Sequence, residues 1–492
     1  MRLPVLILCL CALLPAQPPL PDAAALEREL KRFVDVFAIV MEQAAVAPSS
    51  GQLIYAGAVP GMLRQLDPHS AFFNPDQFEQ LREMQTSVSR GFGSIVSVLP
   101  GRVIVLQVQD GSPAARAGLA AGDEIVAING IALGRLDPEQ LVQVLGMTRQ
   151  RKAEIFVRRP GTARLMPLTL TPAELQSPTV DRAFLAAPGV GYVRAASFDA
   201  HTGKEIREAI EKLGGKALKG LILDLRGNPG GVLTAALDTA ALFLPPGAKL
   251  LSARGRGREV QSVDVPAGFE PYTFPLAVLI DERTASASEI VAGAIQDQDR
   301  GAVVGEPSFG KGLVQSIFPL SEETGLALTT AYYFTPSGRS IQRPLAAGKL
   351  QAAAGAGSRP EFKTAKGRTV RGGGGIEPDA IVRPPAPSQF RFVLEASAAF
   401  PQFATEWLAA HRGEARRGME ITPAMLDDFQ LWLSRRNIRP GIREWTAERM
   451  HITSRLKQEI LNQGVGVDAG DEVEVERDPV VRRALDLLAA PL

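Results

Sequence analysis

The sequence predicts a multi-domain α/β protein with helical regions at both ends. Its 492 residues suggest about three domains, at roughly 100–200 residues per domain. Residues 172–385 alternate buried-looking strands with helices, the order typical of crossover units on a shared sheet. Residues 89–171 carry shorter β-runs, which indicate a small β-rich domain inserted before that sheet.

The first helical region is expected over residues 17–88. A turn between helices is predicted at Leu66–Ser70, where the sequence is Leu-Asp-Pro-His-Ser. Before it, apolar residues recur at the spacing of an amphipathic helix, at Leu26, Leu30, Phe33, Val34, Phe37 and Val40.

The remaining elements follow from the same patterns. In the β-rich domain we expect strands at Val103–Leu106 and Glu154–Val157, with a helix at Pro138–Leu145. In the next region the predicted order is strand, helix, strand, helix, at Leu221–Leu225, Val232–Leu244, Leu276–Ile280 and Ser288–Gln296.

The end of the chain is expected to be a flap followed by helices. Leu345–Gly375 is rich in Gly and Ala and is interpreted as a loop or flap. Residues 386–492 are predicted to be helical, and Phe429, Leu431, Trp432 and Leu433 suggest either a helical core or a subunit interface.

The N-terminus predicts export. Arg2 and the apolar run Leu3–Leu14 have the build of a secretory signal peptide, assigned to residues 1–16. Leu14 stands where a small residue favours cleavage, so an uncleaved segment that tethers the protein to a membrane is the alternative. We expect an exported protein of the periplasm or cell envelope.

Cysteine content and charge exclude several classes of protein. Cys9 and Cys11 are the only cysteines, and both lie in the predicted signal peptide. The mature chain is therefore expected to have no disulfide, no cysteine nucleophile and no thiolate metal site. The 54 basic and 53 acidic residues leave a net charge of +1, which argues against a nucleic-acid partner. We expect no cofactor and no metal.

Two segments that join a strand to a helix are candidates for chemistry. Arg226–Gly231 (Arg-Gly-Asn-Pro-Gly-Gly) presents free backbone N–H groups that suit a phosphate or an oxyanion, unless it is a plain tight turn. Thr284–Glu289 (Thr-Ala-Ser-Ala-Ser-Glu) places a serine at the positive end of a helix dipole. An N-cap with an acidic first turn is the alternative for the second segment.

The third candidate, Gly305–Gly312, nearly matches a phosphate-binding P-loop. The match fails at Gly312, where Ser or Thr should hold magnesium, and Leu313–Phe318 reads as a strand rather than a helix. Lys311 and Gln315 would lie on one face of that strand. A lysine on a surface hairpin is the alternative.

A serine nucleophile needs a base. Lys311 is the best candidate, provided that burial lowers its pKa from about 10.4 to about 7–8. The four histidines lie outside the glycine-rich strand ends, although sequence distance does not exclude a spatial triad; they are His69, His201, His411 and His451.

Together these segments resemble the carboxy-terminal processing proteases, also called tail-specific proteases. The resemblance covers about Leu66 to Asp379. It depends on a series of motifs in the same order, namely Leu66–Ser70, Gly111–Ala114, Ala117–Leu119, Gly122–Asp123, Leu223–Gly231, Thr284–Glu289, Phe309–Gly312 with Gln315, Tyr332–Arg339 and Gly375–Asp379.

The resemblance implies a serine endopeptidase with a Ser/Lys dyad and a crotonase-like α/β core. In the family pattern Ser286 is the nucleophile, Lys311 is the general base and Gln315 orients the lysine. On chemistry alone Ser288 is a rival nucleophile. The implied oxyanion donors are the backbone N–H groups of Ala287 and of either Gly230 or Gly231.

The β-rich domain resembles a PDZ module. The run Gly91-Phe92-Gly93-Ser94, followed by Ile95, is similar to the PDZ carboxylate-binding loop. The resemblance implies capture of a free C-terminus by backbone N–H groups and pairing of the substrate with the neighbouring strand edge. The alternative is the start of a structural hairpin.

The leading prediction is an exported peptidase that cleaves protein or peptide substrates with free C-termini. A homodimer through the helical terminal regions is a further expectation. A non-catalytic, PDZ-bearing binding protein is one alternative, which the presence of Ser286, Lys311 and Gln315 opposes. A P-loop nucleotide enzyme is the other, which Gly312 and the export signal oppose.

Overall fold

The computed structural model describes residues 22–86, 88–149, 151–159, 162, 164–256, 260–344, 359–384, 386–411 and 413–489. The predicted signal peptide, residues 1–16, lies outside these described residues. Across the part of the chain that the structure describes, no helix is both long enough and apolar enough to span a bilayer.

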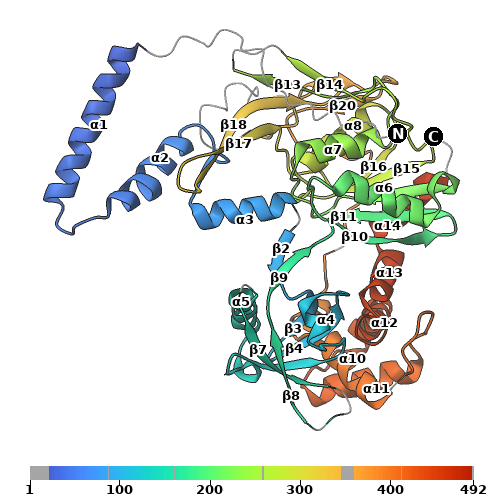
Figure 1. Cartoon of the computed structure of the whole chain (residues 1–492). Helices are drawn as coiled ribbons and strands as arrows, with labels where there is room; N and C mark the ends of the chain where they lie inside the picture. Colours follow the sequence, from blue (N-terminus) through green and yellow to red (C-terminus); the bar gives the residue numbers. More distant parts are fainter. Residues whose placement is uncertain are drawn as a thin grey trace, which may run out of the picture.

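A six-stranded sheet forms the centre of the fold (Figure 1). Its strands, in spatial order, are β10 (Val180–Ala187), β11 (Val190–Ala195), β12 (Gly220–Asp224), β15 (Leu276–Ile280), β16 (Ala302–Gly305) and β21 (Ala380–Ile381). The strands from β11 to β21 run parallel, and only β10 is antiparallel to its neighbour. The crossover units predicted from the sequence are therefore confirmed.

Both faces of this sheet are covered. Leu221 and Leu223 of β12 pack with three helices on one face, namely α6 (Thr202–Leu213), α7 (Leu233–Ala241) and α8 (Ala287–Asp297). Ile222, between them, packs on the other face against α14 (Pro479–Ala489). Every residue of β12 and β15 is buried, which explains why these strands are continuous apolar runs.

A second sheet carries the segment after Lys311. Its strands are β1 (Ala71–Phe73), β13 (Lys249–Gly255), β14 (Gln261–Asp264), β17 (Leu313–Pro319) and β18 (Gly325–Phe334). Strand β1 belongs to the predicted helical N-terminal region and pairs with β18. The region is thus not purely helical, and it contains α1 (Ala23–Gln43), η1 (Gln52–Ala58), α2 (Val59–Arg64) and α3 (Pro75–Thr86) as well as β1.

The β-rich domain is a separate sheet in which β3 is an edge strand. Its elements are β3 (Ser94–Leu99), β4 (Arg102–Val108), α4 (Pro113–Arg116), β5 (Glu124–Ile128), β6 (Ile131–Ala132), η2 (Leu133–Arg135), α5 (Pro138–Thr148), β7 (Ala153–Arg158) and β8 (Met166–Leu170). A two-stranded ribbon of β2 (Val88–Gly91) and β9 (Ala173–Gln176) connects it to the rest of the chain.

The C-terminal region is helical, as predicted. Its first elements are α9 (Gln389–Ala396), α10 (Ala399–Ala410), α11 (Pro423–Arg435), α12 (Ile442–Gly464) and α13 (Val467–Arg477). Phe429, Trp432 and Leu433 lie in the core of this bundle, whereas Leu431 is exposed. In Figure 1, α12 and α13 lie beside the β-rich domain, and α13 leads up to the central sheet.

The predicted flap, Leu345–Gly375, is only partly a loop. Its residues 345–358 lie outside the described part of the chain. The remainder contains an antiparallel hairpin of β19 (Glu361–Lys363) and β20 (Thr369–Arg371). Polar and apolar residues alternate in each of these strands, but the strands are only three residues long and lie among glycines. The sequence pattern therefore does not predict them.

Candidate active site

Ser286 is the N-cap of α8, directly after the loop that leaves the buried strand β15. Its backbone has φ 55° and ψ −115°, a conformation that residues with a side chain rarely adopt. Such strain persists only where the surroundings hold it, and it concentrates at functional sites. The side chain of Ser286 is partly exposed, so a substrate can approach its hydroxyl.

The glycine-rich turn after β12 lies against Ser286. A Cβ placed on Gly230 would be 2.9 Å from the Ser286 Cβ and 3.0 Å from the Ala287 nitrogen. A Cβ on Gly231 would be only 1.9 Å from the Phe198 carbonyl oxygen. Both positions therefore require glycine. The Gly230 N–H donates to Asn228 Oδ1 at 2.9 Å.

Hydrogen bonds join this turn to the serine loop. The Asn228 carbonyl accepts from the Ala285 N–H at 3.0 Å and from the Ser288 hydroxyl at 3.2 Å. The Thr284 hydroxyl donates to the Leu225 carbonyl at 2.8 Å. Ser288 is fully buried, and its hydroxyl is directed into the protein rather than toward a substrate.

Glu289 connects the serine loop to the lysine loop. Its fully buried carboxylate accepts from the Ser286 N–H at 2.8 Å and from the Lys311 N–H at 2.9 Å. It also accepts from the Gly310 N–H at 2.7 Å and from the Ser308 hydroxyl at 2.5 Å. Burial raises the pKa of Glu289, whereas these four donors oppose the rise because they stabilise the ionised form.

Lys311 lies two residues before β17 and is held by Gln315. The Lys311 Nζ donates to Gln315 Oε1 at 2.7 Å, and Gln315 Nε2 donates to the His69 carbonyl at 2.6 Å. Asp67 fixes the turn that carries His69 by accepting the His69 N–H at 2.7 Å and the Ser70 N–H at 2.8 Å. The Leu66–Ser70 segment thus supports the lysine from the N-terminal region.

The environment of Lys311 favours its neutral form. Burial lowers the pKa of Lys311, and the negative charges of Asp67 and Glu289 only partly oppose this shift. Burial also lowers the pKa of His69, and the positive charge of Lys311 lowers it further. A histidine is therefore close to the lysine, which the sequence did not predict.

The other histidines lie elsewhere. His201 precedes α6, His411 stacks on Trp407, and His451 pairs with Glu395 in the C-terminal bundle. Within the described ranges, no group of three or more His, Cys, Asp or Glu residues could hold a metal ion.

A second candidate site is a cavity of about 990 Å³ on the β-rich domain. All five predicted loop residues line it, from Gly91 to Ile95, and the far wall includes Leu145 and Arg149 at the end of α5. The cavity runs along the edge strand β3, where an extended peptide can add a strand.

Comparisons with known proteins agree with this architecture. Residues 104–159 match the PDZ domain family, and residues 189–347 match peptidase family S41. The carboxy-terminal-processing protease of Bartonella bacilliformis is 33% identical over 369 residues, which cover 74% of this chain and 77% of that protein. This chain belongs to the carboxy-terminal processing proteases.

A second curated relative agrees with that assignment. The carboxyl-terminal-processing protease of Synechocystis sp. is 36% identical over 292 residues, covering 58% of this chain and 68% of that protein. Among solved structures, the photosystem II D1 C-terminal processing protease matches 74% of this chain and 94% of that chain, with 27% identity and a TM-score of 0.38.

Sequence reasoning missed several residues of this processing protease's site. The sequence offers Glu289 a place only as the acid of a helix first turn, which is the alternative for that segment, although a lone acid before the apolar run Ile290–Ile295 is a signal of burial. Tyr333, which donates to the Ser286 carbonyl at 3.3 Å, lies in the motif Tyr332–Arg339, but the motif assigns it no role. His69 lies in the motif Leu66–Ser70, but its contact with Gln315 involves its backbone carbonyl, which side-chain patterns do not predict.

Glu289→Gln is expected to lower the free energy of unfolding by about 2–5 kcal/mol and to reduce peptidase activity. In the variant, the NH₂ group of the glutamine amide cannot accept hydrogen bonds, so backbone N–H groups that now donate to a carboxylate oxygen would lose their acceptor. Urea unfolding measures the loss, and Glu306→Gln, at a more exposed site, is the matched control. Equal unfolding midpoints for Glu289→Gln and wild type would show that Glu289 does not hold the two loops together.

Proposed function

We propose that this protease cleaves exported proteins near their C-termini, with Ser286 as the nucleophile and Lys311 as the general base. One observation carries the proposal. The Lys311 Nζ is buried and held by Gln315, on a segment that Glu289 ties to the strained Ser286 loop. A lysine whose pKa is lowered by burial, on a loop joined to that of a partly exposed serine, supports a Ser/Lys dyad.

We propose a reaction in two stages, acylation of Ser286 and its deacylation by water. Lys311 accepts the proton of the Ser286 hydroxyl as its oxygen attacks the scissile carbonyl carbon. Lys311 then gives that proton to the departing amine, and an acyl-enzyme on Ser286 remains. Water, deprotonated by Lys311, then attacks the ester carbon. As the bond to the Ser286 oxygen breaks, Lys311 gives the proton to that oxygen, which releases the acid product and restores the Ser286 hydroxyl and the neutral lysine.

The Ala287 N–H, in the first turn of α8, is one oxyanion donor in this scheme. For the second donor we favour Gly231 over Gly230. The Gly230 N–H already donates to Asn228 Oδ1, so using it would cost that bond.

Ser288 as the nucleophile and His69 as the base fit the structure less well. The Ser288 hydroxyl is fully buried and donates to a backbone carbonyl. His69 contacts the dyad through its carbonyl and Gln315, and we assign it a supporting role.

The PDZ module is proposed to recognise the substrate's C-terminus. Its loop from Gly91 to Ile95 would bind the carboxylate, and the edge strand β3 would pair with the preceding residues. We assign residues 89–171 to this module and residues 172–385 to a crotonase-like core. The β2–β9 ribbon, which joins the two parts, supports a boundary on either side of the module.

We also propose a homodimer through α1. This helix has no buried residue, yet it carries apolar side chains at alternating four- and three-residue spacing, at Leu26, Leu30, Phe33, Phe37 and Val40. Such spacing is typical of the contact face of a coiled-coil helix. In the proposed dimer, this face of α1 would pack against α1 of a second copy.

The first test of the proposed function concerns the dyad. Ser286→Ala and Lys311→Ala should each lower kcat by roughly 10⁴-fold or more, because each removes a group that acts in the reacting unit. The double variant should be little worse than either single variant. Ser288→Ala is the control and should stay active. Full activity of either single variant, with an inactive Ser288→Ala, would reassign the nucleophile.

The second prediction concerns pH. The value of kcat/KM should rise with pH through the pKa of Lys311, which burial lowers from its ordinary value of 10.5, and the same rise should remain in His69→Gln. The folded state disfavours the protonated lysine, so between the ordinary pKa of 10.5 and the lowered value the free energy of unfolding falls as pH falls.

Lys311→Met should remove that dependence and gain stability near neutral pH while losing activity. The test is a pH–rate profile of the wild type and of His69→Gln, combined with urea unfolding of Lys311→Met. The lysine assignment is wrong if His69→Gln folds but is inactive while Lys311→Met retains cleavage.

The third prediction concerns the tail. Amidating the C-terminus of a peptide substrate should weaken binding by about 1.5–3 kcal/mol, because charge-assisted bonds to backbone N–H groups are lost. Steady-state kinetics on the acid and amide forms measure the difference. Equal kcat/KM for both forms would remove the PDZ module from substrate selection.

The last prediction in this group concerns assembly. Leu30→Glu should convert the dimer to a monomer in sedimentation velocity, because it places a charge in the apolar seam. Arg28→Glu, on the outer face of the same helix, should leave the dimer intact. A monomeric wild type, or a dimer that survives Leu30→Glu, would contradict the proposed interface.

A further inference from the structure

The peptide group that joins Ser286 to Ala287 is held from its carbonyl side. The Ser286 carbonyl accepts the N–H groups of Glu289 at 2.9 Å and of Ile290 at 3.1 Å, as the carbonyl of a helix N-cap does. It also accepts the Tyr333 hydroxyl at 3.3 Å. The N–H of the same peptide group belongs to Ala287, which is one oxyanion donor in the proposed reaction. Tyr333 therefore contacts the opposite end of the group that would stabilise the transition state.

The geometry of a peptide group links its two ends. A trans peptide group is planar, so its carbonyl and its N–H point in opposite directions, and the bond to the Ser286 carbonyl therefore helps to fix the direction of the Ala287 N–H. Hydrogen bonds in a chain also polarise one another, so a donor on the carbonyl makes the N–H a stronger donor. This effect matters most in the transition state, when negative charge develops on the substrate oxygen.

Tyr333 is placed by the second sheet. It lies near the end of β18, which pairs with β17 and with β13. The residue is fully buried, and its side chain belongs to the hydrophobic core that includes Ala287. Its backbone N–H donates to the Gly312 carbonyl at 3.1 Å, directly after Lys311. One residue of this sheet thus contacts both the serine loop and the segment that carries the proposed base.

The Tyr333 hydroxyl stays protonated and therefore stays a donor. Burial raises the pKa of Tyr333 well above its ordinary value of 10.0, and a negative charge on Glu289 raises it further. A buried hydroxyl without an acceptor is unfavourable, so burial also favours the bond to the Ser286 carbonyl.

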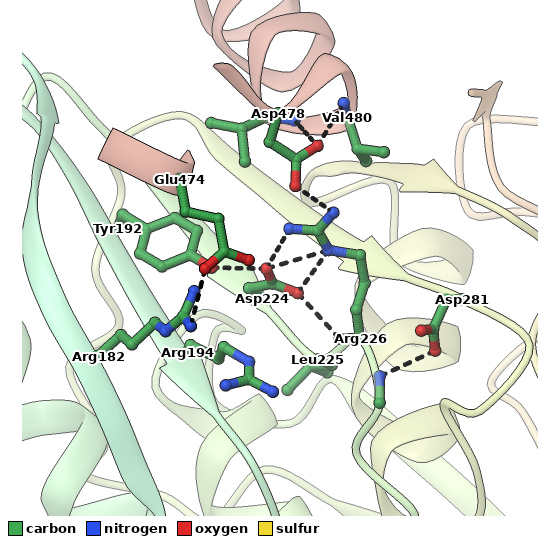
Figure 2. A network of polar contacts seen from close by, with 12 residues as sticks. Arg182, Tyr192, Arg194, Asp224, Leu225, Arg226, Asp281, Glu474, Asp478 and Val480 are labelled. Carbon is green, nitrogen blue, oxygen red and sulfur yellow. Dashed lines mark hydrogen bonds and ion pairs between the residues drawn. The ribbon is translucent and has the colours of Figure 1, made fainter. Parts of the chain in front are cut away.

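The glycine turn, which forms the other side of the proposed oxyanion site, is held by different contacts. Figure 2 shows its first residue, Arg226, bound to Asp224 at 2.6 Å and to Asp478 at 2.6 Å. The N–H of the next residue, Gly227, donates to Asp281 Oδ1 at 2.9 Å. Loss of the tyrosine hydroxyl would therefore leave this turn in place.

We propose that Tyr333 is a positioning residue of this protease, which orients and polarises the Ser286–Ala287 peptide group so that its N–H stabilises the oxyanion. The inference rests on the proposed function, in which Ser286 is the nucleophile and Ala287 is an oxyanion donor. Tyr333 acts through this peptide group and not on the substrate itself. Its hydroxyl therefore stabilises the transition state more than the bound substrate.

Tyr333→Phe removes the hydroxyl and keeps the ring in the core. Its backbone N–H still donates to Gly312, so the lysine segment keeps its place. We expect kcat to fall about tenfold with little change in KM, a smaller loss than the roughly 10²–10³-fold that follows removal of a whole oxyanion donor. The pH at which kcat/KM reaches half its maximum should stay unchanged, because the surroundings of Lys311 are preserved. A shift of this pH would place the action of Tyr333 on the lysine and contradict the proposal.

Tyr272→Phe is the matched control. Tyr272 is buried in the same hydrophobic core as Tyr333, and its hydroxyl donates to Glu211 of α6. Both variants lose a buried tyrosine hydrogen bond, so both should unfold at a lower urea concentration than the wild type. Only Tyr333→Phe should lose kcat. Equal losses of kcat in the two variants would show that Tyr333 has a structural role alone.

A fluorophosphonate separates the role of Tyr333 from the proposed function. As the Ser286 oxygen attacks phosphorus and fluoride leaves, the phosphoryl oxygen takes the oxyanion position. The second-order rate constant of labelling should fall about tenfold in Tyr333→Phe and stay unchanged in Tyr272→Phe.

The two failures can be told apart by mass spectrometry of the labelled wild type. If the wild type is not labelled on Ser286, the proposed function fails and the role of Tyr333 fails with it. If the wild type is labelled on Ser286, and Tyr333→Phe equals it in labelling rate and in kcat, only the role of Tyr333 is wrong.

Discussion

The buried carboxylate of Glu289 is the interaction on which the proposed site depends. Its two oxygens accept four hydrogen bonds from two loops, one from Ser286 and three from the loop that carries Ser308, Gly310 and Lys311. Burial of a carboxylate costs free energy unless its oxygens accept hydrogen bonds, and here three of the four donors are backbone N–H groups. The same bonds fix the serine loop relative to the lysine loop, so the geometry of the proposed dyad depends on the hydrogen bonds of one buried carboxyl group.

The central sheet supplies the other half of the arrangement. Strands β12 and β15 are parallel neighbours, so the turns after their carboxyl ends meet at one edge. The glycine turn follows β12, the serine loop follows β15, and Asn228 and Thr284 bond across them. The second sheet then brings Lys311 and Gln315 to the same edge, where the turn around His69 supports them.

Local patterns in the sequence predicted the parts of this arrangement that local forces determine. The buried strands and the helices after them follow from periodicity. The contact of Lys311 with Gln315 was also predicted, but Lys311 lies before β17 and the register shifts between Val314 and Gln315, so strand alternation is not its cause. The contacts of Glu289, of the His69 carbonyl and of Asp478 could not be predicted in this way. Each joins segments far apart in the sequence through a backbone group or a buried charge, which no periodic pattern records.

The central claim is that Ser286, activated by Lys311, is the nucleophile. The most direct test is to label the full-length protease with a serine-reactive fluorophosphonate and to locate the adduct by tandem mass spectrometry. Tryptic cleavage after Arg283 and Arg300 places Ser286 and Ser288 on one peptide, whose fragment ions distinguish them. The account predicts a single adduct on Ser286 in the wild type and none in Lys311→Met. An adduct on Ser288, or undiminished labelling of Lys311→Met, would contradict it.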